Sequence, residues 1–258
     1  MHKLFAGCLC LLSFLSCGDN VNRMATDDNG ATAEELARTD QPEELAAGEW
    51  TDLLGAGNLD QWHSYNQDEA GSAWKLEDGV VYLDTSNKGE HGVEGGGDLT
   101  TNESYANYEL ELEWKIGECG NSGIIYNVTE SEDLDASYLS GPEMQILDNS
   151  CHPDAEIVTH RAGDLYDMVT GEPENVKPAG EWNRIKLVVT DGHVEQWQNG
   201  ELIVAYDNTG DEWEAMIADS KFSQWESFGK STSGKISLQD HGDPVWFRNI
   251  RIRELSSK

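Results

Sequence analysis

The sequence predicts an all-β protein, a two-sheet β-sandwich of the jelly-roll kind with one helix. The tight-turn dipeptides Asp78-Gly79, Asp191-Gly192 and Asn199-Gly200 lie between segments in which apolar and polar residues alternate. These dipeptides favour hairpin turns, because type I′ turns need positive φ at both central residues. Only residues 211–221 carry a helical pattern, and many short strands with regular turns are typical of sandwiches. A length of 258 residues with 38% hydrophobic content suits one main domain.

The individual elements follow from this alternation. Residues 107–116 place one apolar face on a strand, made of Tyr108, Leu110, Leu112, Trp114 and Ile116. Residues 182–206 contain two of the hairpin turns and predict a three-strand antiparallel meander. In the helical segment Asp211 is placed to cap the start, and one side groups Trp213, Met216, Ile217 and Ser220. Further strands are expected at residues 123–128, 142–148, 235–239 and 245–254.

The first sixteen residues are typical of a signal peptide. Lys3 supplies a positive charge, and the apolar run from Leu4 to Leu15 is too short to cross a bilayer. The following Ser16-Cys17 resembles the end of a bacterial lipoprotein box, in which the cysteine is lipidated; the alternative is an ordinary cleaved signal with an incidental cysteine. In both cases the protein is exported. We expect a lipoprotein of the bacterial cell envelope, in the periplasm or at the outer membrane, that meets the membrane only through its lipid.

Residues 17–48 are expected to form a lipidated N-terminus and a flexible acidic tether. They are rich in Ala, Thr, Asp and Glu and contain no aromatic residue, so they cannot bury enough apolar surface to fold. A short helix at residues 33–37 is compatible with this composition. The jelly-roll domain is then expected at residues 49–258.

Charge and cysteine content restrict the partners and the compartment. The formal net charge is −32, which argues against nucleic acid and anionic membrane surfaces as partners. Cys8 and Cys10 leave with the signal peptide, so Cys119 and Cys151 remain in the folded part. In an oxidising compartment two remaining cysteines suggest a disulfide, although the sequence cannot show that they lie within bonding distance.

Polar side chains on strands and at their ends are the candidates for a site. No nucleotide-binding loop, Gly-x-Ser-x-Gly elbow or zinc-ligand spacing is present, and the glycine run 95–97 is expected to be a flexible loop. In the strand at residues 142–148, Glu143 and Gln145 share one face, whereas Met144 and Ile146 are expected to face the core. The other candidates are Asn121, Asp148, His160, Arg161, Asp164, Tyr166, Asp240 and His241.

Several separated blocks together resemble the 3-keto-disaccharide hydrolase domain family, formerly a domain of unknown function. They are G-N-S-G-I-I-Y, G-P-E-M-Q-I-L-D-N, A-G-D-L-Y-D, E-W-N-R-I-K-L-V-V with Q-N-G-E, and I-S-L-Q-D-H-G-D-P-V-W-F-R-N-I-R-I-R-E-L. The resemblance spans residues 50–255. It implies a concanavalin-like jelly roll and an exported carbohydrate-active enzyme. It also implies a separate sugar dehydrogenase, which first oxidises the C3 hydroxyl of an oligosaccharide or glycoside substrate to a ketone.

The implied chemistry is cleavage of a 3-keto-glycoside. The C3 carbonyl acidifies the C2 proton, so a base removes it, the enolate expels the C1 substituent, and water adds to the product. On matching positions, Glu143 is the first candidate for the base and His241 the second, oriented by Asp240. Substrate contacts are expected from Asn121, Gln145, Arg161 and Tyr166, and from Asp148 if the strand ends or bulges there.

Three questions stay open at this stage. No cofactor is certain, and a divalent metal could bind Glu143, Asp148 or His241, although no ligand spacing demands one. A non-catalytic carbohydrate-binding module is the first alternative, since fold does not fix function. A conventional two-carboxylate glycosidase is the second, but no E-x-D-x-x-E pair is present on one strand.

Overall fold

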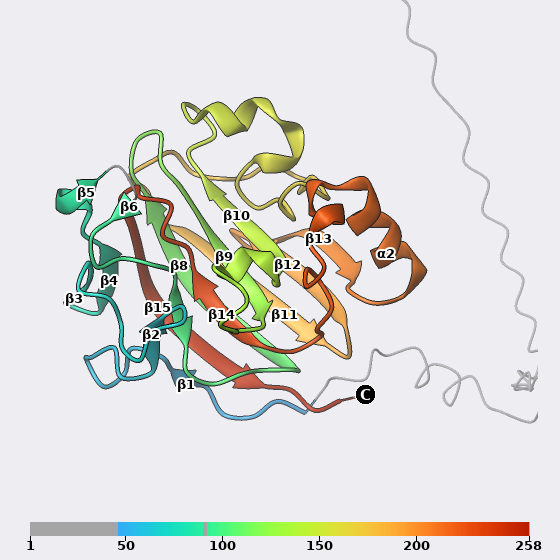
Figure 1. Cartoon of the computed structure of the whole chain (residues 1–258), viewed down its shortest axis with the longest axis horizontal. Helices are drawn as coiled ribbons and strands as arrows, with labels where there is room; N and C mark the ends of the chain where they lie inside the picture. The colour runs from blue at the N-terminus through green and yellow to red at the C-terminus, as the bar shows by residue number, and fades with distance from the viewer. Residues whose placement is uncertain (1–45, 90–91, 258) are drawn as a thin grey trace, which may run out of the picture. The chain divides into compact units, whose positions relative to one another are not determined.

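The polypeptide forms two large antiparallel sheets and one α-helix in this computed structural model, which describes residues 46–89 and 92–257 (Figure 1). The all-β sandwich predicted from sequence is confirmed. The strands are β1 (Thr51–Asp52), β2 (Trp62–Ser64), β3 (Trp74–Glu77), β4 (Val80–Leu83), β5 (Lys88–Gly89), β6 (Gly92–Val93), β7 (Leu99–Thr101), β8 (Tyr108–Ile116), β9 (Asn121–Val128), β10 (Glu143–Leu147), β11 (Asn183–Thr190), β12 (His193–Gln198), β13 (Glu201–Asp207), β14 (Lys235–Leu238) and β15 (Val245–Glu254).

The strands form two packed sheets of different size. The larger sheet has the order β13-β12-β11-β8-β15-β4-β3, with β1 paired to β15. The smaller sheet has the order β10-β9-β14-β7-β2, and β5 pairs with β6 in a separate ribbon. The short 3₁₀ helices are η1 (Thr85–Asn87), η2 (Ser137–Leu139), η3 (Pro153–Glu156), η4 (Val158–His160) and η5 (Lys221–Gln224).

The hairpins form where the turn dipeptides predict them. Strands β11, β12 and β13 pair in sequence as the expected antiparallel meander. Both residues of each turn have positive φ: 50° and 84° at Asp191-Gly192, and 50° and 92° at Asn199-Gly200. This is the geometry that type I′ turns require. The meander therefore sets the register of one edge of the larger sheet.

The hydrophobic core lies between the two sheets. All five apolar residues expected on one face of β8 are buried, as are Met144 and Ile146 of β10. The hydroxyl of Tyr126 on β9 lies 2.6 Å from that of Tyr206 on β13, which joins the two layers at a buried polar contact. Glu143 and Gln145 consequently project from the other face of the smaller sheet, as the alternation of the sequence predicts.

Helix α2 (Gly210–Asp219) follows the meander and packs Trp213 and Ile217 against the core. Its start differs from the sequence prediction. The N-cap residue is Thr209 and Asp211 lies inside the first turn, so Asp211 does not cap the helix. Its carboxylate still lies near the positive end of the helix dipole, which accounts for an acidic residue there.

Most predictions for the N-terminal segment lie outside the described residues. These are the signal peptide at residues 1–16, lipidation of Cys17 and the helix at residues 33–37. Residues 46–48 were expected to belong to the tether, but the Gly48 amide donates to Glu254 O (2.8 Å), and the Ser256 amide donates to Ala46 O (2.9 Å). Among the described residues, no helix is long and apolar enough to span a membrane.

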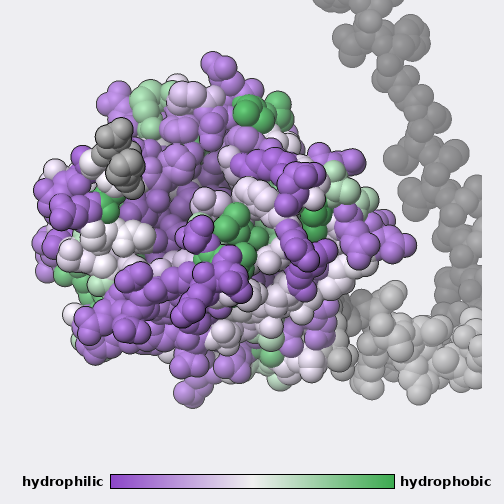
Figure 2. Space-filling model, in the orientation of Figure 1, coloured by the Kyte–Doolittle hydropathy of each residue, from purple (hydrophilic) through white to green (hydrophobic). Residues whose placement is uncertain are grey.

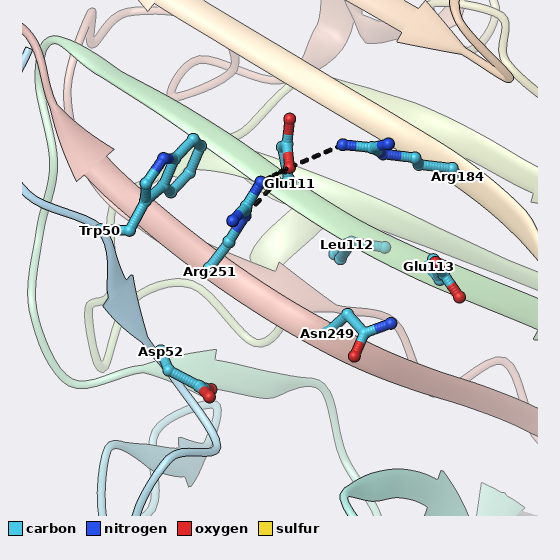
Figure 3. Close-up of a pocket in the computed structure, with 8 residues that line it drawn as sticks. All are labelled: Trp50, Asp52, Glu111, Leu112, Glu113, Arg184, Asn249 and Arg251. Atoms are coloured by element: carbon cyan, nitrogen blue, oxygen red, sulfur yellow. Dashed lines mark hydrogen bonds and ion pairs between the residues drawn. The ribbon is translucent and has the colours of Figure 1, made fainter.

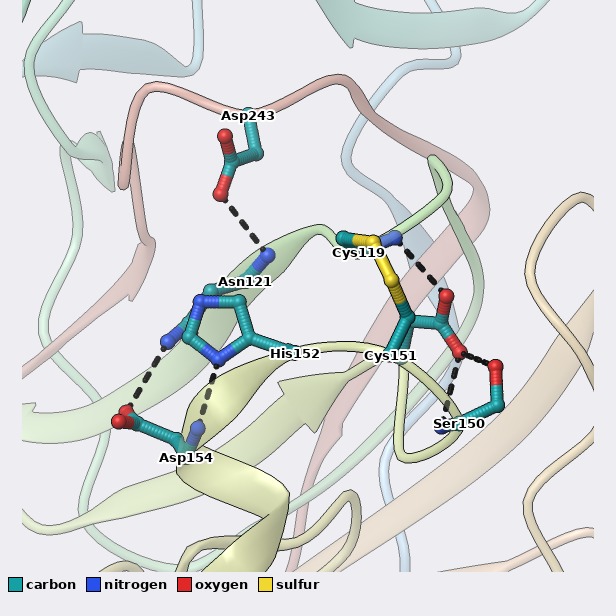
Figure 4. Close-up of a disulfide and its surroundings, with 8 residues drawn as sticks. Cys119, Asn121, Ser150, Cys151, His152, Asp154 and Asp243 are labelled. Atoms are coloured by element: carbon teal, nitrogen blue, oxygen red, sulfur yellow. Dashed lines mark hydrogen bonds between the residues drawn. A yellow bond between two sulfur atoms is a disulfide. The ribbon is translucent and has the colours of Figure 1, made fainter.

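A disulfide between Cys119 and Cys151 ties the start of β9 to the segment after β10, with the two Cα atoms 4.7 Å apart (Figure 4). Asp148 reinforces this junction. Its carboxylate accepts hydrogen bonds from the Cys119 amide (2.9 Å) and from both the amide and the hydroxyl of Ser150 (3.1 and 2.7 Å). The disulfide therefore fixes the ends of the two strands that carry the candidate site.

Candidate active site

A pocket of about 230 Å³ lies on the outer face of the smaller sheet, over β9, β10 and the end of β14. Figure 2 shows this side of the molecule, where hydrophilic residues surround a hollow and hydrophobic residues gather near the centre of the view. The pocket is lined by Asn121, Tyr138, Gly141, Glu143, Gln145, Tyr166, Lys221, Phe222, Trp225, Gln239 and His241. Five of the residues predicted from sequence therefore meet here: Asn121, Glu143, Gln145, Tyr166 and His241.

Glu143 is the one acidic residue among the described residues that line this pocket, and only 6% of its surface is exposed. The neighbouring strand makes room for it, because a Cβ atom added to Gly123 would lie 1.9 Å from the Glu143 Oε1 atom. Any side chain at that position would displace the carboxyl group. The glycine in β9 thus creates the space in which Glu143 is held.

Burial raises the pKa of Glu143 to about 8, and the nearby negative charge of Asp98 acts in the same direction. Desolvation raises the pKa of the half-buried Asp98 to about 6, although Asp98 accepts a hydrogen bond from the hydroxyl of Ser137. The ammonium group of Lys221 opposes the shift of Glu143. A carboxyl whose pKa lies near neutrality is suited to proton transfer at physiological pH.

Lys221 and Tyr166 line the same pocket as Glu143. The Lys221 ammonium lies 3.9 Å from the centre of the Tyr166 ring, and burial lowers its pKa. Burial and the Glu143 charge raise the pKa of Tyr166, so its hydroxyl stays protonated at neutral pH. Asp167 holds Lys221 and His160 in place, because its carboxylate accepts a hydrogen bond from the Lys221 amide (2.8 Å) and lies 2.8 Å from His160 Nε2. The His160 ring packs against Tyr166 in a tilted arrangement, with the ring centres 4.3 Å apart, and so supports a residue that lines the pocket.

His241 reaches the pocket from the loop after β14, but Asp240 does not orient it. Asp240 accepts from the amides of Gly97 and Gly242, each at 2.8 Å, and so holds the glycine run instead. This corrects two expectations, since the loop at residues 95–97 is anchored by Asp240 rather than free. The carboxylate paired with His241 is that of Asp243, 3.9 Å from its Nδ1 atom. The His241 side chain is 49% exposed and can exchange protons with solvent.

Two further residues predicted to contact substrate lie elsewhere. Strand β10 ends at Leu147, and the Asp148 carboxylate that follows accepts hydrogen bonds at the disulfide junction. Burial alone would raise the pKa of Asp148, but the hydrogen bonds from Ser150 and Cys119 outweigh burial and lower it. Arg161 donates to Ala155 O (3.0 Å) and to Glu174 (3.2 Å) at the surface. Neither lines the pocket.

Asp164 was also a candidate for the site. Burial raises its pKa to about 6, and its carboxylate accepts hydrogen bonds from the amides of Gly171 (2.7 Å) and Arg161 (2.6 Å). Asp164 does not line the pocket.

The residues considered for a divalent metal do not converge. Asp148 lies outside the pocket that Glu143 and His241 line. Within the described part of the chain, the one group of three potential ligand side chains is Cys119, Asp148 and Cys151, and its two sulfur atoms are joined in the disulfide. That group therefore does not fit a metal site.

A larger hollow on the other sheet is a less suitable candidate. It measures about 470 Å³, and two of the arginines that line it, Arg184 and Arg251, pair with Glu111 (Figure 3). Glu111 accepts from Arg184 (2.9 Å) and Arg251 (3.0 Å). Burial would raise the pKa of Glu111, but these hydrogen bonds outweigh it and lower the pKa. An acid fixed in its ionised form by two arginines is a structural group rather than a proton-transfer group.

The chain matches a known protein family over most of its length. The model of the 3-keto-alpha-glucoside-1,2-lyase-like domain matches residues 49–253. The chain belongs to this family. The resemblance found in the sequence blocks is thereby confirmed.

Individual relatives agree with the family assignment. A curated 3-keto-disaccharide hydrolase of Bacteroides thetaiotaomicron is 40% identical over 215 residues, covering 75% of this chain and 74% of its own length. A crystal structure from Parabacteroides distasonis, named "putative glycosyl hydrolase", has 30% identity and a TM-score of 0.72, and covers 88% of this chain and 98% of its own. A Bacillus subtilis protein with a galectin-like fold, 13% identical, matches 84% of this chain and 99% of its own with a TM-score of 0.52 and supports the fold alone.

Sequence reasoning missed three features of the site in this family member. Lys221 was seen only as the last residue of a helix, and nothing in its neighbours points to a pocket. Gly123 was seen only as the start of a strand; a glycine inside a strand can signal close approach of another group. Asp98, next to the glycine run, had no pattern of its own, and its effect on the pKa of Glu143 is evident only in the folded structure.

Proposed function

We propose that this protein cleaves 3-keto-glycosides in the pocket over β9 and β10, with Glu143 as the base that removes the C2 proton. The observation that carries this proposal is the buried carboxyl of Glu143, whose pKa is raised to about 8, on the floor of a polar pocket of sugar size. The name of the relative from Bacteroides thetaiotaomicron supports the same substrate class.

The reaction begins with proton transfer from C2 to the Glu143 carboxylate. The electron pair of the C2–H bond moves toward the C3 carbonyl, and the resulting enolate is stabilised by the ammonium of Lys221, which lines the same pocket. The enolate then re-forms the ketone and expels the C1 oxygen, which leaves a C1=C2 double bond. Water then adds at C1 and gives one proton to the group that protonated the leaving oxygen, while the proton held by Glu143 returns to C2, so the net reaction is hydrolysis.

The leaving oxygen needs a proton as the C1–O bond breaks. His241 lines the pocket, is half-exposed, and lies near the Asp243 carboxylate, so it can be reprotonated from solvent after each turnover. Tyr166 is a neutral hydroxyl whose raised pKa makes it a weak acid, better suited to donating a hydrogen bond to the substrate. We therefore assign the acid to His241.

Conventional two-carboxylate hydrolysis is disfavoured by the composition of the pocket. That mechanism needs a pair of carboxyl groups on either side of the scissile bond. Glu143 is the one carboxylate among the described residues that line the pocket. A substrate that carries its own activating ketone removes the need for the second acid.

The proposal places the protein after an oxidation step. A sugar dehydrogenase that converts the C3 hydroxyl to a ketone must supply the substrate, because an unoxidised sugar has no acidic C2 proton. We further propose that the protein is exported and anchored in the bacterial envelope through lipid on Cys17. The apolar run at Leu4 to Leu15 and the Ser16-Cys17 sequence after it support this part of the proposal.

A C2-deuterated 3-keto-glucoside tests the proposed step. We expect slower cleavage of the deuterated than of the protiated substrate by the wild-type protein in single-turnover experiments, because the C2–H bond breaks in the reaction. Glu143→Gln should lower turnover about 100-fold or more and His241→Asn should lower it as well, the usual size of general acid-base effects. Near-normal rates in both variants with an intact fold would show that base and acid are misassigned.

A further inference from the structure

The outer face of the larger sheet carries a hollow of about 460 Å³ that shares no residue with the pocket over Glu143. Its charge differs from that of the protein as a whole, in which acidic residues outnumber lysine and arginine 49 to 17. The lining of this hollow contains three cations, Lys177, Arg184 and Lys186, and one acid, Glu111. We call it the cationic hollow. Its excess of positive charge attracts an anion.

Strand alternation places two of these cations side by side on the outer face. Arg184 and Lys186 are two residues apart on β11. Ile185 between them is buried in the core, so both cations project from the opposite face of the sheet. The turn between β12 and β13 holds the backbone here, because the Asn199 amide donates to Arg184 O (2.8 Å) and the Arg184 amide donates to Asn199 Oδ1 (3.0 Å).

The one acid of the cationic hollow is already paired. Glu111 on β8 has a side chain only 14% exposed, and it accepts hydrogen bonds from Arg184 (2.9 Å) and Arg251 (3.0 Å; Figure 3). Two arginines more than balance its charge. The neighbouring hollow of about 470 Å³ also contains Glu111 and Arg184, but Asp52 and Glu113 add two further acids to its lining. An anion is therefore better placed in the cationic hollow.

The cations of this hollow keep hydrogen-bond donors that an anion can use. Arg184 Nη2 donates to Glu111, but a guanidinium has five N–H donors and this side chain is 60% exposed. The Lys177 ammonium donates to Trp182 O (2.8 Å), and an ammonium has three hydrogens. Within the described residues, Lys186 has no hydrogen-bond or ion-pair partner. Charge-assisted hydrogen bonds to a carboxylate or sulfate are therefore open to each of them.

Trp197 supplies a surface for a ring beside these donors. It is half-buried, and its indole N–H donates to Glu195 Oε2 (2.8 Å), which fixes the orientation of the ring. Lys186 lies opposite Trp197 on the neighbouring strand, with its ammonium 4.0 Å from the ring centre. A hollow of about 460 Å³ is within the range of about 300 to 1,000 Å³ that organic ligands occupy. A ring that carries an acidic group fits this combination of indole and cation.

We propose that the cationic hollow is a second, non-catalytic site that binds an acidic sugar residue of a polysaccharide, one that carries a carboxylate or a sulfate. The acidic group binds Arg184 and Lys186, and the planar fork of Arg184 matches a carboxylate. The sugar ring lies against Trp197. Acids elsewhere on the protein oppose this binding little, because charges more than about 8 Å away are largely screened at physiological ionic strength. The pocket over Glu143 lies on the other sheet and stays open.

Titration calorimetry of the purified protein with a short oligogalacturonate tests the proposal. The methyl ester of the same oligomer has the same rings without the charge and should bind about 10-fold more weakly or worse, the usual size of a lost charged hydrogen bond. A sulfated oligomer of a neutral sugar is the second acidic probe. Binding of either acidic probe supports the site, and the tighter of the two identifies the acidic group. Added salt should weaken the binding.

Lys186→Gln is the most informative variant, because it breaks no ion pair among the described residues and should not disturb the fold. It should weaken binding of the acidic probe about 10-fold, and Trp197→Ala should do the same. Arg184→Lys should retain more affinity than Arg184→Gln, since it keeps the charge and loses only the fork. The control is Lys75→Gln, which removes an exposed lysine of β3 in the same sheet, outside the hollow, and should bind as the wild type does.

Three results would overturn the proposal: no binding of either acidic probe, equal binding of the methyl ester, or wild-type affinity in both Lys186→Gln and Trp197→Ala. Polyglutamate carries carboxylates on a peptide chain instead of sugar rings. If it binds as tightly as the oligogalacturonate, the assignment to a sugar fails and an acidic protein is indicated. None of these titrations needs a 3-keto substrate, so they succeed or fail independently of the cleavage proposed for the pocket over Glu143.

Discussion

Replacing Glu143 by glutamine should lower turnover about 100-fold or more and make the protein more resistant to alkaline pH. The pKa of Glu143 is about 8 in the folded protein and 4.5 ordinarily. Between these values the folded protein keeps a proton that the unfolded chain releases, so its stability falls as the pH rises through this window. At 1.36 kcal/mol for each pKa unit, the wild type should lose on the order of 3 kcal/mol between pH 5 and pH 8 through this group.

The isosteric amide of Glu143→Gln has no proton to lose. Its stability advantage over the wild type should therefore be small at pH 5 and grow to roughly 3 kcal/mol at pH 8, or roughly 6 to 12 °C in Tm for a domain of this size. Thermal unfolding of both proteins at pH 5, 6, 7 and 8 measures this difference. Other titrating groups such as Asp98 are common to both proteins and largely cancel.

An exposed acid provides the matched control. Glu132→Gln removes an exposed carboxylate, and its Tm difference from the wild type should stay nearly constant from pH 5 to pH 8. A constant difference for Glu143→Gln as well would refute the reasoning, because it would show that Glu143 has the same protonation in the folded and unfolded states. The trade of stability for a buried reactive group is common at active sites.

Four further results are expected. In the wild type, kcat/KM for a 3-keto-glycoside should rise between pH 6 and pH 8, because Glu143 must lose its proton; a flat profile over this range would point to another base. Lys221→Met should lower turnover about 100-fold and move the midpoint of that profile upward, since Lys221 lowers the pKa of Glu143, whereas Lys221→Arg should retain more activity. Replacing Cys119 and Cys151 by alanine should lower the free energy of unfolding by about 2 to 4 kcal/mol in denaturant titrations; no loss would show that the disulfide does not stabilise the fold. Cys17→Ala should move the protein from membrane to soluble fractions, and unchanged fractionation would exclude the lipid anchor.

Local signals in the sequence were sufficient for most of the fold. Alternation along β8 and the positive-φ dipeptides of the meander act over a few residues, so their consequences can be predicted without knowledge of the partner strands. The helix start was wrong by two residues, because Thr209 and Asp211 are both acceptable near a helix N-terminus and only the backbone decides between them.

The candidate site was only partly predictable, for a physical reason. The face of β10 that carries Glu143 and Gln145 follows from strand periodicity, and the loop residue His241 followed from the family blocks. The contributions of Lys221, Gly123 and Asp98 depend on contacts between segments far apart in the chain, which periodicity cannot show. Asp148 and Asp240 were misplaced because a carboxylate that accepts backbone amides has the same sequence appearance as one that contacts a substrate.

The most direct test of the account compares a 3-keto-glucoside with the matching unoxidised glucoside, each incubated with purified protein with and without a chelator. The account predicts that only the 3-keto-glucoside is cleaved, because only the C3 carbonyl makes the C2 proton acidic enough for Glu143 to remove. Cleavage of both substrates at similar rates would contradict it and indicate conventional glycoside hydrolysis, and cleavage of neither would indicate a protein that only binds sugar.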